Sequence, residues 1–186
     1  QVNSILAVVK EERQKIKDKS TSEYVVMVTK DGIIKKVEAS SFENVRKSGL
    51  IAVTLKGGDV LRRAKLTYGA DQIILITKMG QSIRFPEKDV RAMGRQASGV
   101  HAMRLKKDDE IVGVDTITSK EQTGNSRLLV VMENGFGKQT LVKHYKKQKR
   151  GGSGVKTAKI TKKTGAVVGA QIVGEEDEEL IAISRK

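Results

Sequence analysis

The stretch Glu23-Tyr-Val-Val-Met-Val-Thr-Lys-Asp-Gly32 decides the fold, because similar stretches occur twice more in the chain. They are Asp71-Gln-Ile-Ile-Leu-Ile-Thr-Lys-Met-Gly80 and Arg127-Leu-Leu-Val-Val-Met-Glu-Asn-Gly135. Short runs of Val, Ile and Leu bounded by Gly, Asp and Lys predict strands and turns, not helices. A glycine at the end of each run suits a tight hairpin turn, which needs a positive φ. Each copy therefore predicts a β-hairpin.

Each copy is followed by the same series of further features. The second strand of the hairpin carries basic residues, which are Lys35 and Lys36, then Arg84, then Lys138. A basic loop comes next and closes with Ser-Gly and an aliphatic residue at 48–50, 98–100 and 153–155. A last apolar strand begins at Val60, Ile111 and Val167. Four short strands in a unit of about 50 residues are typical of a propeller blade.

The repeats predict one all-β domain, a propeller-like array of four-stranded blades. We expect about three complete blades, at 23–70, 71–126 and 127–174, plus partial blades at both ends. Residues 1–22 would hold the last strand of a preceding blade and a linker. Residues 175–186 would hold an acidic linker and the first strand of a next blade. A single blade cannot bury its own faces, so the blades must pack side by side.

The composition points to a polyanionic partner. Among 186 residues, 36 Lys and Arg stand against 22 Asp and Glu, a formal net charge of +14. Such an excess favours nucleic acid first and an acidic membrane surface second. The apolar runs are about five residues long, well short of the roughly 20 that a spanning helix needs, so no segment should cross a bilayer. We expect nucleic acid as the partner and no membrane.

Catalysis finds little support in the residue types. The absence of Cys excludes a disulfide framework, a thiolate nucleophile and Cys-ligated zinc. The two histidines, His101 and His144, lie in different repeats without clustered carboxylates. No Gly-rich loop ends in Gly-Lys-Ser/Thr, so nothing indicates a bound nucleotide. We expect a non-catalytic segment that holds no metal or cofactor.

The basic residues gather at equivalent places in the repeats. Ten Lys and Arg and no acidic residue lie between Asn134 and Gly174. Equivalent slots of a blade array lie at equivalent places around its arc, so the charges should form a curved stripe that suits the phosphates of bent duplex DNA. The predicted DNA contacts are Lys35, Lys36, Arg46, Lys47, Arg84, Arg91, Arg95, Lys138, Lys143, Lys146, Lys147, Lys149 and Arg150.

Several stretches of the second repeat resemble a known family. They are Ile83-Arg84-Phe85, Val90-Arg-Ala-Met-Gly-Arg95 and Ser98-Gly-Val100. They look like the C-terminal DNA-wrapping domain of the DNA gyrase A protein, whose close relative is the corresponding protein of topoisomerase IV. The resemblance covers essentially the whole chain. It implies a β-pinwheel, a propeller variant whose blades exchange strands, of which this chain would be a fragment.

One loop of the third repeat is similar to the gyrase box, the heptapeptide Gln-Arg-Arg-Gly-Gly-Lys-Gly of that family. The loop reads Gln148, Lys149, Arg150, Gly151, Gly152, Ser153 and Gly154. Five positions match, Lys149 keeps the charge of the arginine it replaces, and Ser153 loses that of the lysine. The family carries its box in the first blade, so a box-like loop in a later blade is the alternative interpretation.

The resemblance implies a function for the whole enzyme and for this part of it. The segment would bind, bend and wrap duplex DNA without reading sequence, in support of ATP-dependent negative supercoiling. ATP and magnesium would bind elsewhere in the enzyme. The partners would be duplex DNA and, in a heterotetramer, a second copy of the parent protein together with the ATPase protein. The location would be the bacterial cytoplasm, at the nucleoid, and the fragment could self-associate through open blade edges.

Two other functions remain open at this stage. A propeller with a basic rim could dock acidic proteins, and the run Glu175 to Glu179 would be an internal version of such a ligand. A ribosome-associated RNA-binding module is the weaker alternative, because the loops lack the aromatic residues on which unpaired bases stack.

Overall fold

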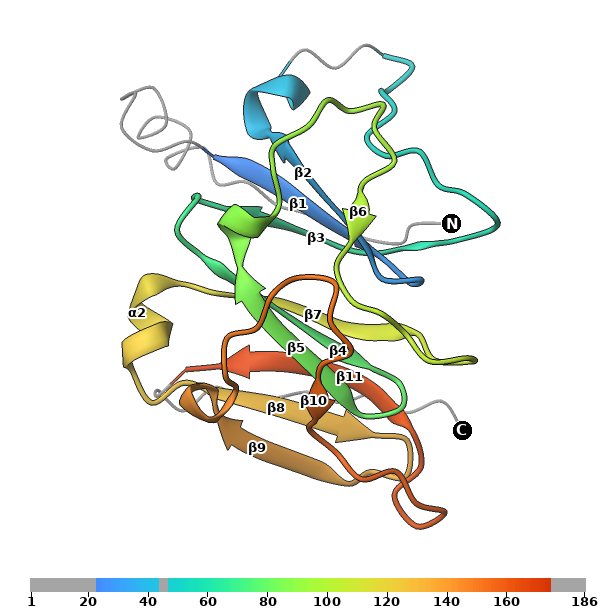
Figure 1. Cartoon of the computed structure of the whole chain (residues 1–186), viewed down its shortest axis with the longest axis vertical. Helices are drawn as coiled ribbons and strands as arrows, with labels where there is room; N and C mark the ends of the chain where they lie inside the picture. The colour runs from blue at the N-terminus through green and yellow to red at the C-terminus, as the bar shows by residue number, and fades with distance from the viewer. Residues whose placement is uncertain (1–22, 44–46, 175–186) are drawn as a thin grey trace.

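The computed structural model describes residues 23–43 and 47–174, which form three antiparallel sheets (Figure 1). The strands predicted within 1–22 and 175–186 lie outside these residues. The first sheet has the order β3-β1-β2-β6, with bounds Leu61–Thr67, Tyr24–Thr29, Ile33–Glu38 and Val100–His101. The second has the order β10-β5-β4-β7, with bounds Val155–Lys156, Gln81–Pro86, Gln72–Thr77 and Ile111–Ile117. The third has the order β11-β8-β9, with bounds Val167–Val173, Arg127–Met132 and Gly137–Leu141.

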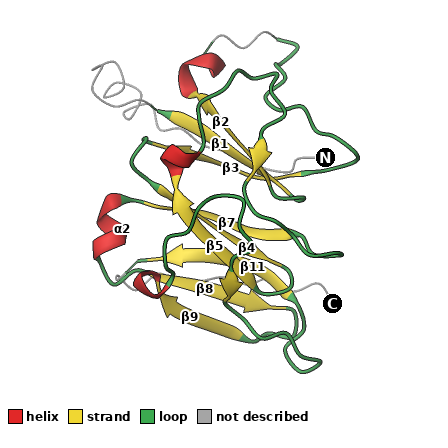
Figure 2. Cartoon of the chain, viewed as in Figure 1, coloured by secondary structure: helices red, strands yellow, loops and turns green. Residues whose placement is uncertain are grey.

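Helical turns are short and lie between the strands (Figure 2). Each hairpin is followed by one 3-10 turn, which are η1 (Ala39–Phe42), η2 (Glu87–Asp89) and η3 (Val142–His144). The short α-helix α2 (Ser119–Thr123) joins the second repeat to the third. Within the described ranges no helix is long and apolar enough to cross a membrane.

Within residues 23–43 and 47–174, two strands pair outside their own repeat. Strand β6 comes from the second repeat but pairs with β2 of the first, where Val100 lies opposite Ile34. Strand β10 comes from the third repeat and pairs with β5 of the second, where Val155 lies opposite Ser82. Each of these repeats therefore lends a two-residue strand to the repeat before it, and this backbone pairing forms the joint between them.

Strand β4 shows how the repeats pack. All six of its residues are buried, because both faces of its sheet are covered. Ile73 and Leu75 belong to a core shared with the first sheet, which includes Val26 and Val28. Ile74 and Ile76 point to the opposite face and belong to a core shared with the third sheet. The side-by-side packing expected of blades is what buries both faces.

Strands β3, β7 and β11 lie next to one another at one edge of the three sheets, opposite the edge formed by β6 and β10. Asp115 of β7 binds both of its neighbours. Its Oδ1 lies 2.8 Å from the Nζ of Lys65 in β3, and its Oδ2 accepts a 2.7 Å hydrogen bond from the amide of Ile172 in β11. We call this the β3–β7–β11 edge, and the opposite one the β6–β10 edge.

The repeated Ser-Gly pair is explained by a close backbone approach at the joints. Gly99 and Gly154 have φ of +88° and +74°, in the left-handed region that favours glycine. A Cβ on Gly154 would lie 2.4 Å from the carbonyl oxygen of Ser82, and one on Gly99 would lie 2.7 Å from that of Ile34. The donated strand can reach its partner only where this side chain is missing.

The substitution Gly154→Ala should therefore destabilise the protein by more than its backbone conformation alone explains. We expect a loss of about 2 kcal/mol or more, from left-handed strain and from the overlap with Ser82. Gly58→Ala is the control, because Gly58 has a φ of +77° and nothing within 4 Å of its Cβ position. Urea unfolding of both variants would measure the difference, and equal losses would show that the close approach carries no cost.

A cluster of charges joins the first two repeats at the hairpin-turn end of the sheets. Glu110 lies 2.8 Å from Arg62, 3.4 Å from Lys78 and 3.9 Å from Lys30. Burial alone would raise the pKa of Glu110, but Arg62 and Lys78 outweigh it and hold that pKa below its ordinary value. The carboxylate therefore binds fewer protons in the folded than in the unfolded protein, which stabilises the fold above the ordinary pKa of Glu.

The variant Glu110→Gln should lose stability at pH 7 and should approach the unmodified protein as the pH falls. We expect a loss of about 1 kcal/mol at pH 7, given the partial exposure of these pairs. The difference should shrink as the pH falls from about 4.5 through the lowered pKa. Urea unfolding at pH 7 and pH 3 measures it, and a loss independent of pH would contradict the electrostatic account.

Candidate nucleic-acid interface

The basic loop of the third repeat lies across the second repeat, where backbone hydrogen bonds hold it. The amide of Gln148 donates to the carbonyl of Arg84 at 2.7 Å, and the amide of Gly151 donates to Ala102 at 2.7 Å. The loop of the second repeat crosses the first in the same way, since the amide of Met93 donates to Lys36 at 2.9 Å. The loops therefore lie at successive joints, along the β6–β10 edge.

Most of the predicted loop cations reach solvent. Lys47, Arg91, Lys143, Lys146, Lys147 and Lys149 are exposed, whereas Arg95 and Arg150 are half-buried. Lys138 is also exposed, but it lies in β9 and its Nζ donates to the carbonyl of Thr157 at 3.2 Å. Arg46 lies outside the described residues. The exposed ammonium and guanidinium groups recur at more than one joint, as phosphate contacts along a curved duplex require.

The structure buries three of the predicted DNA contacts, so their charged groups do not face solvent. Lys35, Lys36 and Arg84 have exposed fractions of 1%, 6% and 5%. Lys35 donates from Nζ to the carbonyl of Ala52 at 2.9 Å and to that of Arg95. Burial lowers the pKa of Lys35, and the charge of Arg95 lowers it further.

Arg84 is buried beneath the loop of the third repeat and hydrogen-bonds the backbone where that loop begins. Its Nη1 donates to the carbonyls of Val142 and Tyr145 at 2.8 and 3.0 Å, and its Nε donates to Gln72 Oε1 at 2.6 Å. Burial lowers the pKa of Arg84. The guanidinium thus satisfies two carbonyls at the start of the loop and has no access to a phosphate.

Lys36 occupies the equivalent position in the first repeat and makes an ion pair there. Its Nζ lies 3.5 Å from Glu87 Oε1 and 4.6 Å from the centre of the Tyr24 ring. Glu87 is fully buried and also accepts hydrogen bonds from Thr67 Oγ1 at 2.8 Å and from the amide of Gly69 at 3.0 Å. Sequence reasoning missed Glu87, since only the fold shows that residues 67–69 of the first repeat surround it.

Some residues of the box-like loop 148–154 contact the second repeat at the joint, and others face solvent. Arg150 donates from Nε to the carbonyl of Asp89 at 3.2 Å and from Nη1 to that of His101. Gly151 takes a φ of +82°, and the carbonyl of Gly152 accepts from the amide of Arg104 at 2.9 Å. Gln148, Gly152 and Gly154 are half-buried, which leaves Lys149 and Ser153 exposed.

Two further residues bear on what this surface could bind. Exposed Arg104 lies beside the loop, and sequence reasoning missed it because it follows the donated strand rather than preceding it. Tyr145, the aromatic residue within the loop, is 6% exposed and its Oη lies 2.6 Å from Thr157 Oγ1. Its ring is therefore unavailable for stacking on a base.

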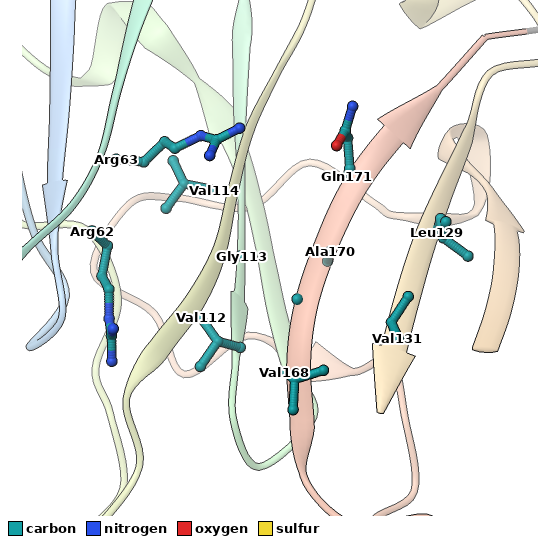
Figure 3. Close-up of a pocket in the computed structure, with 11 residues that line it drawn as sticks. Arg62, Arg63, Val112, Gly113, Val114, Leu129, Val131, Val168, Ala170 and Gln171 are labelled. Carbon is teal, nitrogen blue, oxygen red and sulfur yellow. The ribbon is translucent and has the colours of Figure 1, made fainter. Parts of the chain in front are cut away.

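A pocket lies on the β3–β7–β11 edge, away from the loops (Figure 3). Its volume is about 340 Å³, and apolar residues of β7, β8 and β11 line it, with Arg62 and Arg63 of β3 on one side. Among the residues with a described position, no group of three or more His, Asp or Glu could hold a metal ion. His101 and His144 are both exposed and lie in separate repeats.

The sequence of the chain matches a known family in each repeat. The family model described as DNA gyrase C-terminal domain, beta-propeller, matches residues 23–67, 71–118 and 127–174. The DNA gyrase A protein of Staphylococcus epidermidis is 40% identical over 164 residues, which are 87% of this chain and 18% of that protein. The DNA gyrase A protein of Staphylococcus aureus strain MRSA252 is 39% identical over the same share. The chain thus spans about a fifth of the length of these relatives.

Solved structures agree with the sequence match. A DNA gyrase A C-terminal domain has a TM-score of 0.74 and 33% identity, over 87% of this chain and 52% of that one. A C-terminal domain of DNA topoisomerase IV has a TM-score of 0.77 and 29% identity, over 85% and 48%. The all-β, β-pinwheel fold and the family resemblance are both confirmed. With the family model covering all three repeats, the chain belongs to the DNA gyrase C-terminal domain family.

Proposed function

We propose that this chain binds duplex DNA through the phosphates and bends it along the β6–β10 edge. The observation that carries the proposal is the recurrence of exposed cations on loops held at successive joints. The stretch from Lys143 to Lys156 contributes most of them and contains no acidic residue. Phosphates are recognised by such charges without regard to sequence, and a duplex that follows several joints must bend.

Within the longer protein, the wrapped DNA would support ATP-dependent negative supercoiling by a type II topoisomerase. ATP hydrolysis, magnesium binding and strand cleavage belong to other parts of that enzyme in this proposal. The partners are duplex DNA, a second copy of the longer protein, and the ATPase protein of the same enzyme, in the bacterial cytoplasm. Family membership and the DNA gyrase A relatives support this assignment.

Charge reversal in the exposed part of the loop should weaken binding to every duplex sequence about equally. The double variant Lys147→Glu and Lys149→Glu removes two phosphate contacts, so the slope of log affinity against log salt should become less steep by about 1.8. The unmodified protein should show a slope of roughly −5 to −9, for about six to ten contacts. Filter binding across a salt series measures both slopes.

The matched control is Lys106→Glu with Lys107→Glu. These lysines are also exposed, but they lie at the hairpin-turn end, where the neighbouring Asp109 accepts the amide of Met79. The control should keep the slope of the unmodified protein. A slope near zero for the unmodified protein would refute phosphate binding, and retention of an acidic protein in place of DNA would favour the docking function.

Replacement of Arg84 tests whether this buried cation stabilises the fold without contacting DNA. Arg84→Gln leaves the carbonyls of Val142 and Tyr145 without their charged donor, which should destabilise the protein by about 2–4 kcal/mol in urea unfolding. Where the variant remains folded, its salt slope should equal that of the unmodified protein. A slope less steep by about 0.9 would mean that Arg84 contacts a phosphate after all.

A further inference from the structure

An exposed arginine follows strand β6 and lies against the loop of the next repeat. The backbone amide of Arg104 donates to the carbonyl of Gly152 at 2.9 Å. Two residues earlier, the carbonyl of Ala102 accepts a 2.7 Å hydrogen bond from the amide of Gly151. These two hydrogen bonds hold the segment after β6, which belongs to the second repeat, beside the turn of the box-like loop, which belongs to the third.

The preceding joint has the same arrangement. There the carbonyl of Gln96, in the loop of the second repeat, accepts a 3.1 Å hydrogen bond from Thr54 Oγ1 of the first repeat. Thr54, Arg104 and Lys159 occupy equivalent positions, five residues after the glycine of each Ser-Gly pair. All three are exposed. The position therefore faces solvent in every repeat, lies beside the following loop at both joints, and carries a cation in two of the three repeats.

Cations from two repeats meet at the turn of the box-like loop. The carbonyl oxygen of Lys149 lies 3.5 Å from the Cβ position of Gly152, the residue to which Arg104 is bonded, so the turn brings Lys149 back towards Arg104. In the ranges 23–43 and 47–174, neither of these two exposed side chains forms an ion pair. Asp89 reaches this turn only through its backbone carbonyl, which accepts from Arg150 at 3.2 Å.

We propose that Arg104 and Lys149 bind the same DNA phosphate, so that one phosphate site is built from two successive repeats. The inference rests on the proposed function and assigns a contact within it. A guanidinium can donate two parallel hydrogen bonds to a phosphate, and an ammonium adds a second point charge. The site exists only while the segment after β6 lies against the loop, so bound DNA also stabilises the joint.

A phosphate of a duplex is the ligand because the neighbouring cations also need partners. A single carboxylate would satisfy the guanidinium of Arg104 alone. A duplex carries one phosphate per about 3.4 Å of each strand, so a strand seated at Arg104 brings further phosphates towards Lys146 and Lys147 of the same loop. Both of these lysines are exposed.

Filter binding of the full 186-residue chain to mixed-sequence duplexes tests the assignment. Arg104→Gln should weaken binding about five- to tenfold at about 0.1 M salt, equally for every sequence, because it removes a charged donor from a phosphate. Arg63→Gln is the matched control and should bind as the unmodified chain does. Arg63 is exposed and has no ion pair in the described part of the chain, but it lies on the β3–β7–β11 edge.

A double-mutant cycle shows whether the two side chains share one phosphate. The loss in the double variant Arg104→Gln with Lys149→Gln should differ from the product of the two single losses by about threefold or more, because groups that bind one ligand atom are coupled. Arg104→Gln combined with Lys47→Gln, in the loop of the first repeat, should give the product of the single losses. Losses that multiply in both pairs would overturn the shared site.

Thr54→Arg tests the same position by adding a contact. It places a guanidinium beside the loop of the second repeat, so the slope of log affinity against log salt should become steeper by about 0.9. An unchanged slope would count against a phosphate contact at this position. Binding that depends on salt but is unaffected by Arg104→Gln would overturn this inference alone, whereas an unmodified chain with a slope near zero would refute the proposed function itself.

Discussion

The joint between successive repeats is the constraint on which the rest of the structure depends. A donated two-residue strand and a crossing loop bring backbone carbonyls into a region that water does not reach, and those carbonyls need donors. The side chains of Lys35 and Arg84 supply them, because a long basic side chain can carry its donors into the joint. A buried charge is tolerated only when it is hydrogen-bonded or paired, and these residues meet that condition.

The repeats themselves could be read from the sequence, because alternating apolar residues and turn glycines are local signals. The burial of the basic residues could not be predicted from the sequence. Lys35 and Lys36 stand between Ile34 and Val37 in a strand covered on both faces, so neither side of the strand faces water. Their partners are carbonyls at residues 52, 87 and 95, and no local pattern shows that these residues come near.

The box-like loop illustrates the same limit at the candidate site. Its sequence indicates a basic Gly-rich turn, which the structure has. Sequence alone does not show which of its charged residues bind the protein and which face solvent. In the structure Arg150 donates to the carbonyl of Asp89, whereas Lys149 is exposed. The third repeat also lacks a basic residue at the position that Lys36 and Arg84 occupy in the first two repeats. Gln139 occupies this position and pairs with Leu129. The buried cation at that position therefore belongs to two joints, not to every repeat.

The placement of the acidic residues explains how a protein with many carboxylates keeps one strongly positive edge. In the described part of the chain, the ion pairs use Glu87 inside a joint, Glu110 directly before β7 and Asp115 within β7. Glu110 and Asp115 neutralise cations of the first two repeats away from the loops, whereas Glu87 pairs with Lys36 where the loop of the second repeat crosses the first. The cations from Lys143 to Lys156 have no acid in their own stretch to pair with. Their field adds along the β6–β10 edge, where it would draw in a polyanion from a distance set by the ionic strength.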